Sequence, residues 1–174
     1  TGASLFLGET MFEDRLLLVL REGPPSLAQL FGDRRHIGER QPLSLSLHVA
    51  LGLIEQLEPL HQAGLVFTDL CAQNVLLGAG GAVGLVNHGA AVPKGEAAPE
   101  PRSWAYAAPE QWRREACCER TDVFGVAAVL LYLLTGQAPY HTGAEPVRGA
   151  CRASCLSPDR YEPVLRRLRA HPEV

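Results

Sequence analysis

Lysine is almost absent from this sequence: Lys94 is the single one among 174 residues, and the formal net charge is −3. No run of basic residues and no basic cluster with interleaved aromatic residues occurs, so the charge pattern indicates neither a nucleic-acid partner nor a membrane surface. The longest apolar run, Val123 to Leu134, is shorter than the about 20 residues that a membrane-spanning helix needs. The N-terminus shows no signal-peptide pattern. We expect no nucleic acid, no membrane span and a cytoplasmic location.

Cysteine is also scarce and follows no metal-binding pattern. The chain holds five cysteines, an odd number, and no two of them have C-x-x-C spacing. Cys151 and Cys155 are separated by three residues, but no histidine lies near them at the spacing of a zinc site. The cysteines are therefore expected to be free thiols in a reducing compartment, with no metal bound.

Hydrophobic patterning predicts a small piece of sheet, then helices with one embedded hairpin, in a single domain. Leu5 to Phe12 and Leu16 to Leu20 are expected to be neighbouring antiparallel strands, and Ser26 is expected to begin a short helix. Apolar residues recur at three- and four-residue steps through Leu43 to Ala63, which predicts a long helix. Val75 to Val86, with its central glycines, predicts a hairpin.

Two segments follow in the second half of the chain. Asn87 to Ala108 is rich in Pro, Ala and Gly and is expected to be a long surface loop. Thr121 is expected to cap a helix over Val123 to Leu134, and a helix that is apolar all round must be buried on every side. This helix is predicted to form the centre of the domain.

The order and spacing of several short motifs resemble those of protein kinases. Asp69 and Asn74 stand where the kinase catalytic loop, H-R-D-L-x-x-x-N, has its Asp and its Asn. Thirteen residues beyond Asn74, the triplet Asn87-His88-Gly89 occupies the place of D-F-G, and a later triplet matches A-P-E. Small-molecule kinases share the Asp-x-x-x-x-Asn loop but lack the A-P-E motif and the buried helix after Asp122. The protein-kinase branch is therefore favoured.

This resemblance implies an α+β, protein-kinase-like fold. Residues 1–23 would form the end of the small lobe and the hinge, and residues 24–174 a mainly helical large lobe, truncated before its end. The glycine-rich loop and the V-A-I-K lysine are not in the sequence, so the chain is expected to begin inside the small lobe. Glu22 would lie at the hinge and Leu76 at the floor of a nucleotide pocket. The implied structural residues are Gly89, Ala108, Pro109, Glu110 and Asp122.

The departures from the kinase pattern fall on the catalytic chemistry. Asn87 replaces the D-F-G aspartate, Phe67 and Thr68 replace the His-Arg pair, and Cys71 replaces a lysine. Magnesium is usually held by carboxylates and phosphate oxygens, and loss of one preorganised electrostatic group slows an enzyme by about 10²–10³-fold. These substitutions predict a pseudokinase that is not an enzyme and binds no cofactor or metal. Asp69, Asn74, Asn87 and the pocket residues Glu22 and Leu76 would then be vestigial.

The Phe-Thr-Asp and Asn-His-Gly substitutions are most similar to those of the PEAK/Pragmin family of inactive kinases. This similarity implies a catalytically inactive scaffold or adaptor that assembles signalling proteins and acts on the cytoskeleton and cell motility. Its partners would be signalling adaptors, phosphoserine-binding proteins and, through dimerisation, itself or a related pseudokinase. Two alternatives stay open: a nucleotide-binding switch, and an atypical weak protein kinase that binds ATP with magnesium or manganese despite Asn87.

Overall fold

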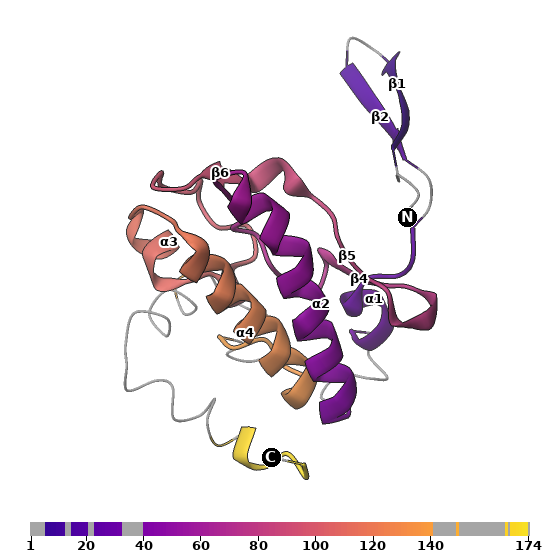
Figure 1. Ribbon diagram of the computed structural model, residues 1–174, viewed down its shortest axis with the longest axis vertical. Helices are drawn as coiled ribbons and strands as arrows, with labels where there is room; N and C mark the ends of the chain where they lie inside the picture. The colour runs from indigo at the N-terminus through magenta and orange to yellow at the C-terminus, as the bar shows by residue number, and fades with distance from the viewer. Residues whose placement is uncertain are drawn as a thin grey trace.

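The computed structural model describes residues 6–12, 15–20, 23–32, 40–140, 149, 166 and 168–173. A two-stranded antiparallel hairpin, β1 (Phe6–Phe12) and β2 (Arg15–Leu20), stands apart from the helical body (Figure 1). Both strands were predicted from their apolar runs, and they are confirmed. The hinge position Glu22 lies outside the described residues, so its role stays a prediction.

The first helix, α1 (Leu27–Phe31), begins where its cap predicts. The Gln29 amide N–H donates to Ser26 Oγ at 3.2 Å, and the Ser26 N–H donates to Gln29 Oε1 at 2.7 Å. This reciprocal capping satisfies two backbone donors that the helix itself cannot bond. The Ala28 N–H donates to the Ala72 carbonyl at 2.9 Å, so α1 is fixed against the segment that carries Asp69 and Asn74.

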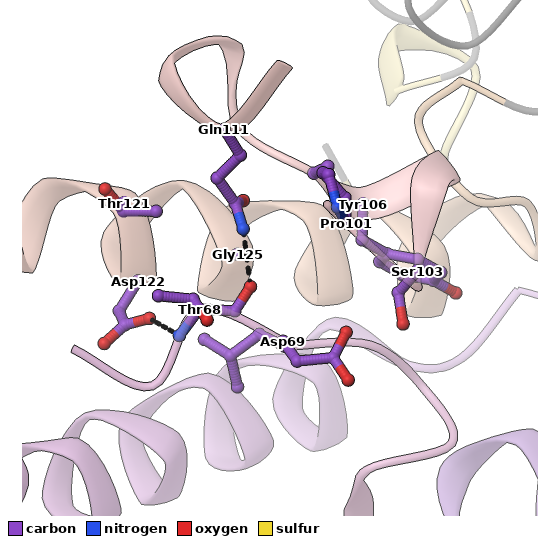
Figure 2. Close-up of a pocket in the computed structure, with 11 residues that line it drawn as sticks. Thr68, Asp69, Pro101, Ser103, Tyr106, Gln111, Thr121, Asp122 and Gly125 are labelled. Atoms are coloured by element: carbon purple, nitrogen blue, oxygen red, sulfur yellow. Dashed lines mark hydrogen bonds between the residues drawn. The ribbon is translucent and has the colours of Figure 1, made fainter. Parts of the chain in front are cut away.

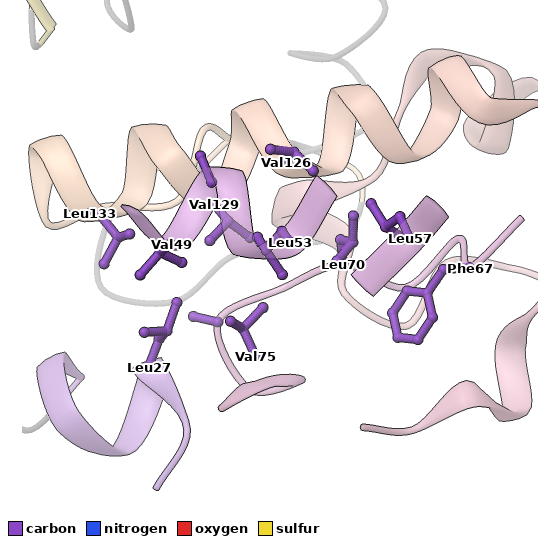
Figure 3. Packing of buried hydrophobic residues seen from close by; sticks show 12 residues of the cluster. Leu27, Val49, Leu53, Leu57, Phe67, Leu70, Val75, Val126, Val129 and Leu133 are labelled. Carbon is purple, nitrogen blue, oxygen red and sulfur yellow. The ribbon is translucent and has the colours of Figure 1, made fainter. Parts of the chain in front are cut away.

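Two long helices, α2 (Leu43–Gln62) and α4 (Glu119–Thr135), lie side by side in the helical body (Figure 1). Their facing side chains form the main core together with residues of α1 and of the loop after α2 (Figure 3). Gly64 follows α2 with φ of +75°, a conformation that favours glycine and ends the helix as predicted. The fully or nearly buried core residues are Leu27, Val49, Ala50, Leu53, Leu57, Phe67, Leu70, Ala72, Val75, Val126, Val129 and Leu133.

The helix α4 corrects two sequence-based predictions. It begins at Glu119, with Cys118 in the N-cap position, so Thr121 is not the cap; its hydroxyl instead accepts the Cys118 N–H at 3.2 Å. The helix is also not buried on every side, because Val123 is 63% exposed. The side that is buried approaches the catalytic-loop segment closely. A Cβ built on Gly125 would lie 2.7 Å from the Leu70 Cβ, so a side chain at this position would push the two segments apart.

Short strands and turns connect these helices. The predicted hairpin is confirmed as β4 (Val75–Leu77) paired with β5 (Val83–Leu85). The predicted surface loop contains β6 (Val92–Pro93), which pairs with β3 (Leu65–Val66). The remaining short elements are η1 (Ala79–Gly81), η2 (His88–Ala90), η3 (Trp104–Tyr106) and α3 (Pro109–Arg113). The helices and small antiparallel sheets confirm the predicted α+β class.

The structure bears on two expectations from the composition, the state of the cysteines and the presence of membrane-spanning helices. Cys71, Cys117 and Cys118 are free, whereas Cys151 and Cys155 lie outside the described residues. Within the described ranges, no helix has the length and apolar character that crossing a membrane requires.

Candidate active site

The loop from Phe67 to Asn74 is held in place by one buried carboxylate. Asp122, which is 1% exposed in α4, accepts hydrogen bonds from the backbone N–H groups of Phe67 and Thr68, both at 2.8 Å. The ring of His61, near the end of α2, lies 2.8 Å from the same carboxylate. Hydrogen bonds to a charged acceptor are among the strong ones in proteins. Asp122 therefore joins α2, α4 and the start of the loop.

Thr68 is held in a backbone conformation that a β-branched residue rarely adopts. Its φ is +65°, which costs on the order of 1–3 kcal/mol and persists only where the surroundings enforce it. Its N–H donates to Asp122, and its carbonyl accepts from Gln111 Nε2 at 2.8 Å (Figure 2). Its hydroxyl donates to the Ala90 carbonyl at 2.7 Å. These bonds fix the direction in which the next residue, Asp69, leaves the backbone.

The three polar residues singled out by the motifs, Asp69, Asn74 and Asn87, come together. Asn74 Nδ2 donates to the Asp69 carbonyl at 2.8 Å and to Asp69 Oδ2 at 3.0 Å. Asn87 Nδ2 in turn donates to Asn74 Oδ1 at 3.2 Å. All three residues line one cavity of about 370 Å³. The spacing of the motifs thus predicted a real cluster of side chains.

The donor set of this cluster fits a divalent cation only weakly. Asp69 supplies one carboxylate, and Asn74 and Asn87 offer neutral amide oxygens. Magnesium takes oxygen ligands and often relies on one or two carboxylates together with substrate phosphates. In the part of the chain that the structure describes, no group of three His, Cys, Asp or Glu side chains forms a site of its own. A cation here would have to arrive with the phosphates of a nucleotide.

Phe67 and His88 form an aromatic pair across two motifs. Their ring centroids are 5.3 Å apart and the planes meet at 87°, the edge-to-face arrangement that aromatic rings favour. The kinase pattern has an imidazole in the first motif and a phenyl ring in the second, and this chain has them exchanged. The two substituted residues contact each other in this chain, so we treat them as one linked change. The sequence analysis counted Phe67 as a loss and did not connect it with His88, although the reciprocal exchange of ring types is visible in the sequence.

We expect the Phe67–His88 contact to show as coupling in a double-mutant cycle. The variants Phe67→Leu and His88→Ala and their combination should give a coupling free energy of about 0.5–1.5 kcal/mol in thermal or urea unfolding. Strictly additive effects of the two substitutions would show that the rings do not stabilise each other.

Cys71 and Tyr106 line the same cavity and stay uncharged. Burial raises the pKa of the Cys71 thiol, and a hydrogen bond with the Ser103 side chain opposes this shift without cancelling it. Burial also raises the pKa of Tyr106 well above its ordinary value. Figure 2 shows the Asp69 carboxylate and the Ser103 side chain directed toward the same space. The kinase pattern has a lysine at the position of Cys71, so in this chain a neutral thiol replaces a positive charge.

The segment after Asn87 is anchored by contacts within the protein. The pairing of β6 with β3 holds its first part, and the exposed ion pair between Lys94 and Glu119 ties it to α4. The Cys117 N–H donates to the Glu96 carbonyl at 2.8 Å. Residues 90–102 contain no Ser, Thr or Tyr. This stretch therefore has no hydroxyl to phosphorylate, and Thr68 in place of an arginine could not bind a phosphate as an arginine does.

The predicted structural residues lie around this segment. Gly89 is exposed in η2, Ala108 is fully buried, and Pro109 begins α3. Glu110 accepts a hydrogen bond from the Thr121 hydroxyl at 2.6 Å. Leu76 is half-buried in β4 and forms an isolated bridge with Ser26. The structural roles of these residues stay predictions.

Comparison with known proteins identifies the family. The protein kinase domain family, Pkinase, matches residues 10–160. The probable serine/threonine-protein kinase SCO3848 of Streptomyces coelicolor is 28% identical over 140 residues, which is 75% of this chain and 21% of that protein. The serine/threonine-protein kinase PknB of Mycobacterium leprae is 24% identical over 155 residues, 79% of this chain and 25% of that protein. The chain thus spans between a fifth and a quarter of these relatives.

These relatives overturn the prediction of a catalytically inactive scaffold. They carry the names of serine/threonine-protein kinases, so the kinship indicates an enzyme and contradicts the assignment as a non-enzymatic pseudokinase. The substitutions at Phe67, Thr68, Cys71 and Asn87 were counted as losses without regard to what surrounds them. The similarity does not single out the PEAK/Pragmin family. With 151 of its 174 residues matched (10 through 160), the chain belongs to the protein kinase domain family.

Proposed function

We propose that this chain forms the large lobe of a serine/threonine protein kinase that transfers phosphoryl groups slowly. The observation that carries the proposal is the position of Asp69. Its carboxylate accepts a hydrogen bond from Asn74 Nδ2 at 3.0 Å, and the residue lines the cavity. The backbone just before Asp69 is fixed by hydrogen bonds from Thr68 to Asp122 and Gln111. The names of the relatives support serine or threonine as the acceptor residue.

Asp69 is suited to accept the proton of a substrate hydroxyl. In the transfer, the hydroxyl oxygen bonds to the terminal phosphorus of ATP and the bond from that phosphorus to the ADP oxygen breaks. The hydroxyl proton passes to the Asp69 carboxylate. Asn74 orients this carboxylate through its amide. Asn74 and Asn87 are the residues that would hold a divalent cation, which would neutralise charge on the phosphates.

The rate of phosphotransfer is expected to be low because the site holds a cation weakly and has no lysine at residue 71, so little positive charge faces the phosphates. Neither Asn74 nor Asn87 carries the negative charge that holds a cation firmly, and Cys71 is neutral. Loss of one such electrostatic group costs about 10²–10³-fold in rate. Association with signalling adaptors or phosphoserine-binding proteins, dimerisation and a link to the cytoskeleton stay predictions.

The test is a phosphotransfer assay with the full-length protein, ATP and either magnesium or manganese. We expect incorporation into peptides with serine or threonine, and a fall to the uncatalysed background in Asp69→Asn. Glu115→Gln is the matched control, since its side chain is 57% exposed in an ion pair with Arg113. If wild type and Asp69→Asn gave the same rate, the proposal would be wrong. Metal-dependent ATP binding without any transfer would favour the nucleotide-binding switch instead.

A further inference from the structure

Arg102 lines the cavity of the candidate active site. It lines the cavity of about 370 Å³ beside Asp69, Asn74 and Asn87. It also lines a second, smaller cavity of about 40 Å³ that Asp69 shares. Its neighbours are ordered: Pro101 is buried, and η3 begins two residues later. Arg102 thus lines the same cavities as Asp69, lies between a buried proline and η3, and has an exposed side chain.

Arg102 differs from Arg113 and Arg114 in having no partner among the described residues. Arg113 and Arg114 pair with Glu115 and Glu100, at 3.9 Å and 3.4 Å. The Arg102 guanidinium makes no ion pair or hydrogen bond with any residue that the structure describes. Its charge is therefore available to a ligand. It is also the single Lys or Arg among the described residues that line either cavity.

A nucleotide bound in this cavity would need a positively charged side chain near its phosphates. A nucleotide brings several negative charges into a cavity whose own charged residue is otherwise the Asp69 carboxylate. Cys71 cannot supply a positive charge, and because burial raises its pKa, its thiol stays neutral and adds no negative charge either. A guanidinium suits phosphate particularly well, since its planar fork donates two parallel hydrogen bonds to two oxygens.

We propose that Arg102 binds the terminal phosphoryl group of the nucleotide and supplies the positive charge that Cys71 does not. The proposal rests on the proposed kinase function of the same site. Arg102 is then a catalytic residue delivered by the loop before α3 and not by the Asp69–Asn74 loop. A phosphate group on a phosphorylated protein substrate has the same chemistry as the terminal phosphate of a nucleotide. If Arg102 binds the nucleotide, its removal weakens nucleotide binding; if it binds the protein substrate, its removal weakens binding of the phosphorylated peptide.

The test compares ATP with ADP on the full-length protein. An arginine that contacts the terminal phosphate should contribute to binding of the ATP analogue AMP-PNP and not to binding of ADP. In Arg102→Gln, we expect the dissociation constant for AMP-PNP to rise roughly tenfold or more and that for ADP to stay unchanged, as a lost charged hydrogen bond implies. Arg102→Lys should retain part of the preference.

Two further variants sharpen the test. Arg113→Gln removes an exposed arginine of α3 that lines neither cavity, and it should change neither constant. Cys71→Lys combined with Arg102→Gln should recover the preference for AMP-PNP, since residue 71 lines the same cavity.

The outcomes separate this proposal from the kinase function. Equal constants in wild type and Arg102→Gln, with phosphotransfer that needs Asp69, would overturn the role of Arg102 alone. Absence of transfer, with an AMP-PNP preference that needs Arg102, would overturn the kinase function alone. Weakened binding of a phosphorylated peptide with unchanged nucleotide binding would place the phosphate on the protein substrate and refute the proposal. Failure of the wild type to bind either nucleotide would refute both.

Discussion

Replacing Asn87 with Asp is expected to raise the phosphotransfer rate by roughly 10²-fold, the size of one restored electrostatic group. The side chains have nearly the same shape, and Asp tolerates the left-handed backbone at φ of +70° about as well as Asn. The substitution adds a carboxylate beside Asn74 Oδ1, at the place where a cation and the nucleotide phosphates would meet. The gain should appear in kcat with magnesium and ATP.

The same variant has a second signature that does not depend on activity. Asn87 Nδ2 donates to Asn74 Oδ1 at 3.2 Å, and an aspartate would face that oxygen with another acceptor. Without metal, Asn87→Asp should therefore melt at a lower temperature than the wild type. Magnesium with ATP should stabilise it more than it stabilises the wild type, because the variant adds a carboxylate to the groups that would hold the cation.

A double variant shows whether the gain in rate depends on Asp69. In the Asp69→Asn background, Asn87→Asp should give no gain in rate, since the base that accepts the hydroxyl proton is absent. A rate that stays at the wild-type level in the single variant would mean that Asn87 does not limit transfer. A gain that persists without Asp69 would mean that another group accepts the proton.

Local elements could be predicted from the sequence because their signals are local. Ser26 and Gln29 are three residues apart and cap one helix, and Gly64 and Gly136 end helices at positive φ. The β4–β5 hairpin follows from its glycine turn. The cluster of Asp69, Asn74 and Asn87 was found by motif spacing, since the family pattern records contacts that the single sequence does not display.

What could not be predicted depends on contacts between distant residues. Asp122 bonds a loop more than 50 residues earlier in the chain, and Phe67 touches His88 across the hairpin. Arg102 carries no pattern of its own, and only the fold brings it beside Asp69. The exposure of Val123 was missed because periodicity shows which residues are apolar and not which faces another element covers.

The wrong prediction of an inactive protein has the same origin. A motif comparison scores each substituted position separately, whereas the site works through the sum of its charges and contacts. Phe67 and His88 form a ring contact with each other, and Arg102 lines the cavity where Cys71 carries no charge. At Asn87, where a cation and the phosphates would meet, no described residue supplies the missing carboxylate. This is why the largest change in rate is expected there.

The largest loss of stability is expected at Asp122, a position that touches no substrate. Asp122→Ala should lower the free energy of unfolding of the kinase domain by roughly 3–5 kcal/mol, the range for removing one partner of a buried charged network. The substitution leaves the buried N–H groups of Phe67 and Thr68 without their acceptor, and each such group costs about 1–3 kcal/mol. It also releases Thr68 from the positive φ that the carboxylate helps to enforce.

Two comparison variants show whether the loss comes from these bonds. Asp122→Asn keeps one acceptor but turns an NH₂ group toward the second backbone N–H, so it should lose stability nearly as much as Asp122→Ala. Glu119→Gln, on the exposed side of the same helix in an ion pair with Lys94, should change stability by less than about 1 kcal/mol. Urea unfolding measures all three, and a loss below about 1 kcal/mol in Asp122→Ala would show that the loop is held by other contacts. Because the three bonds of this carboxylate set the backbone on which Asp69 stands, the surviving folded fraction of Asp122→Ala should also transfer phosphate more slowly per molecule.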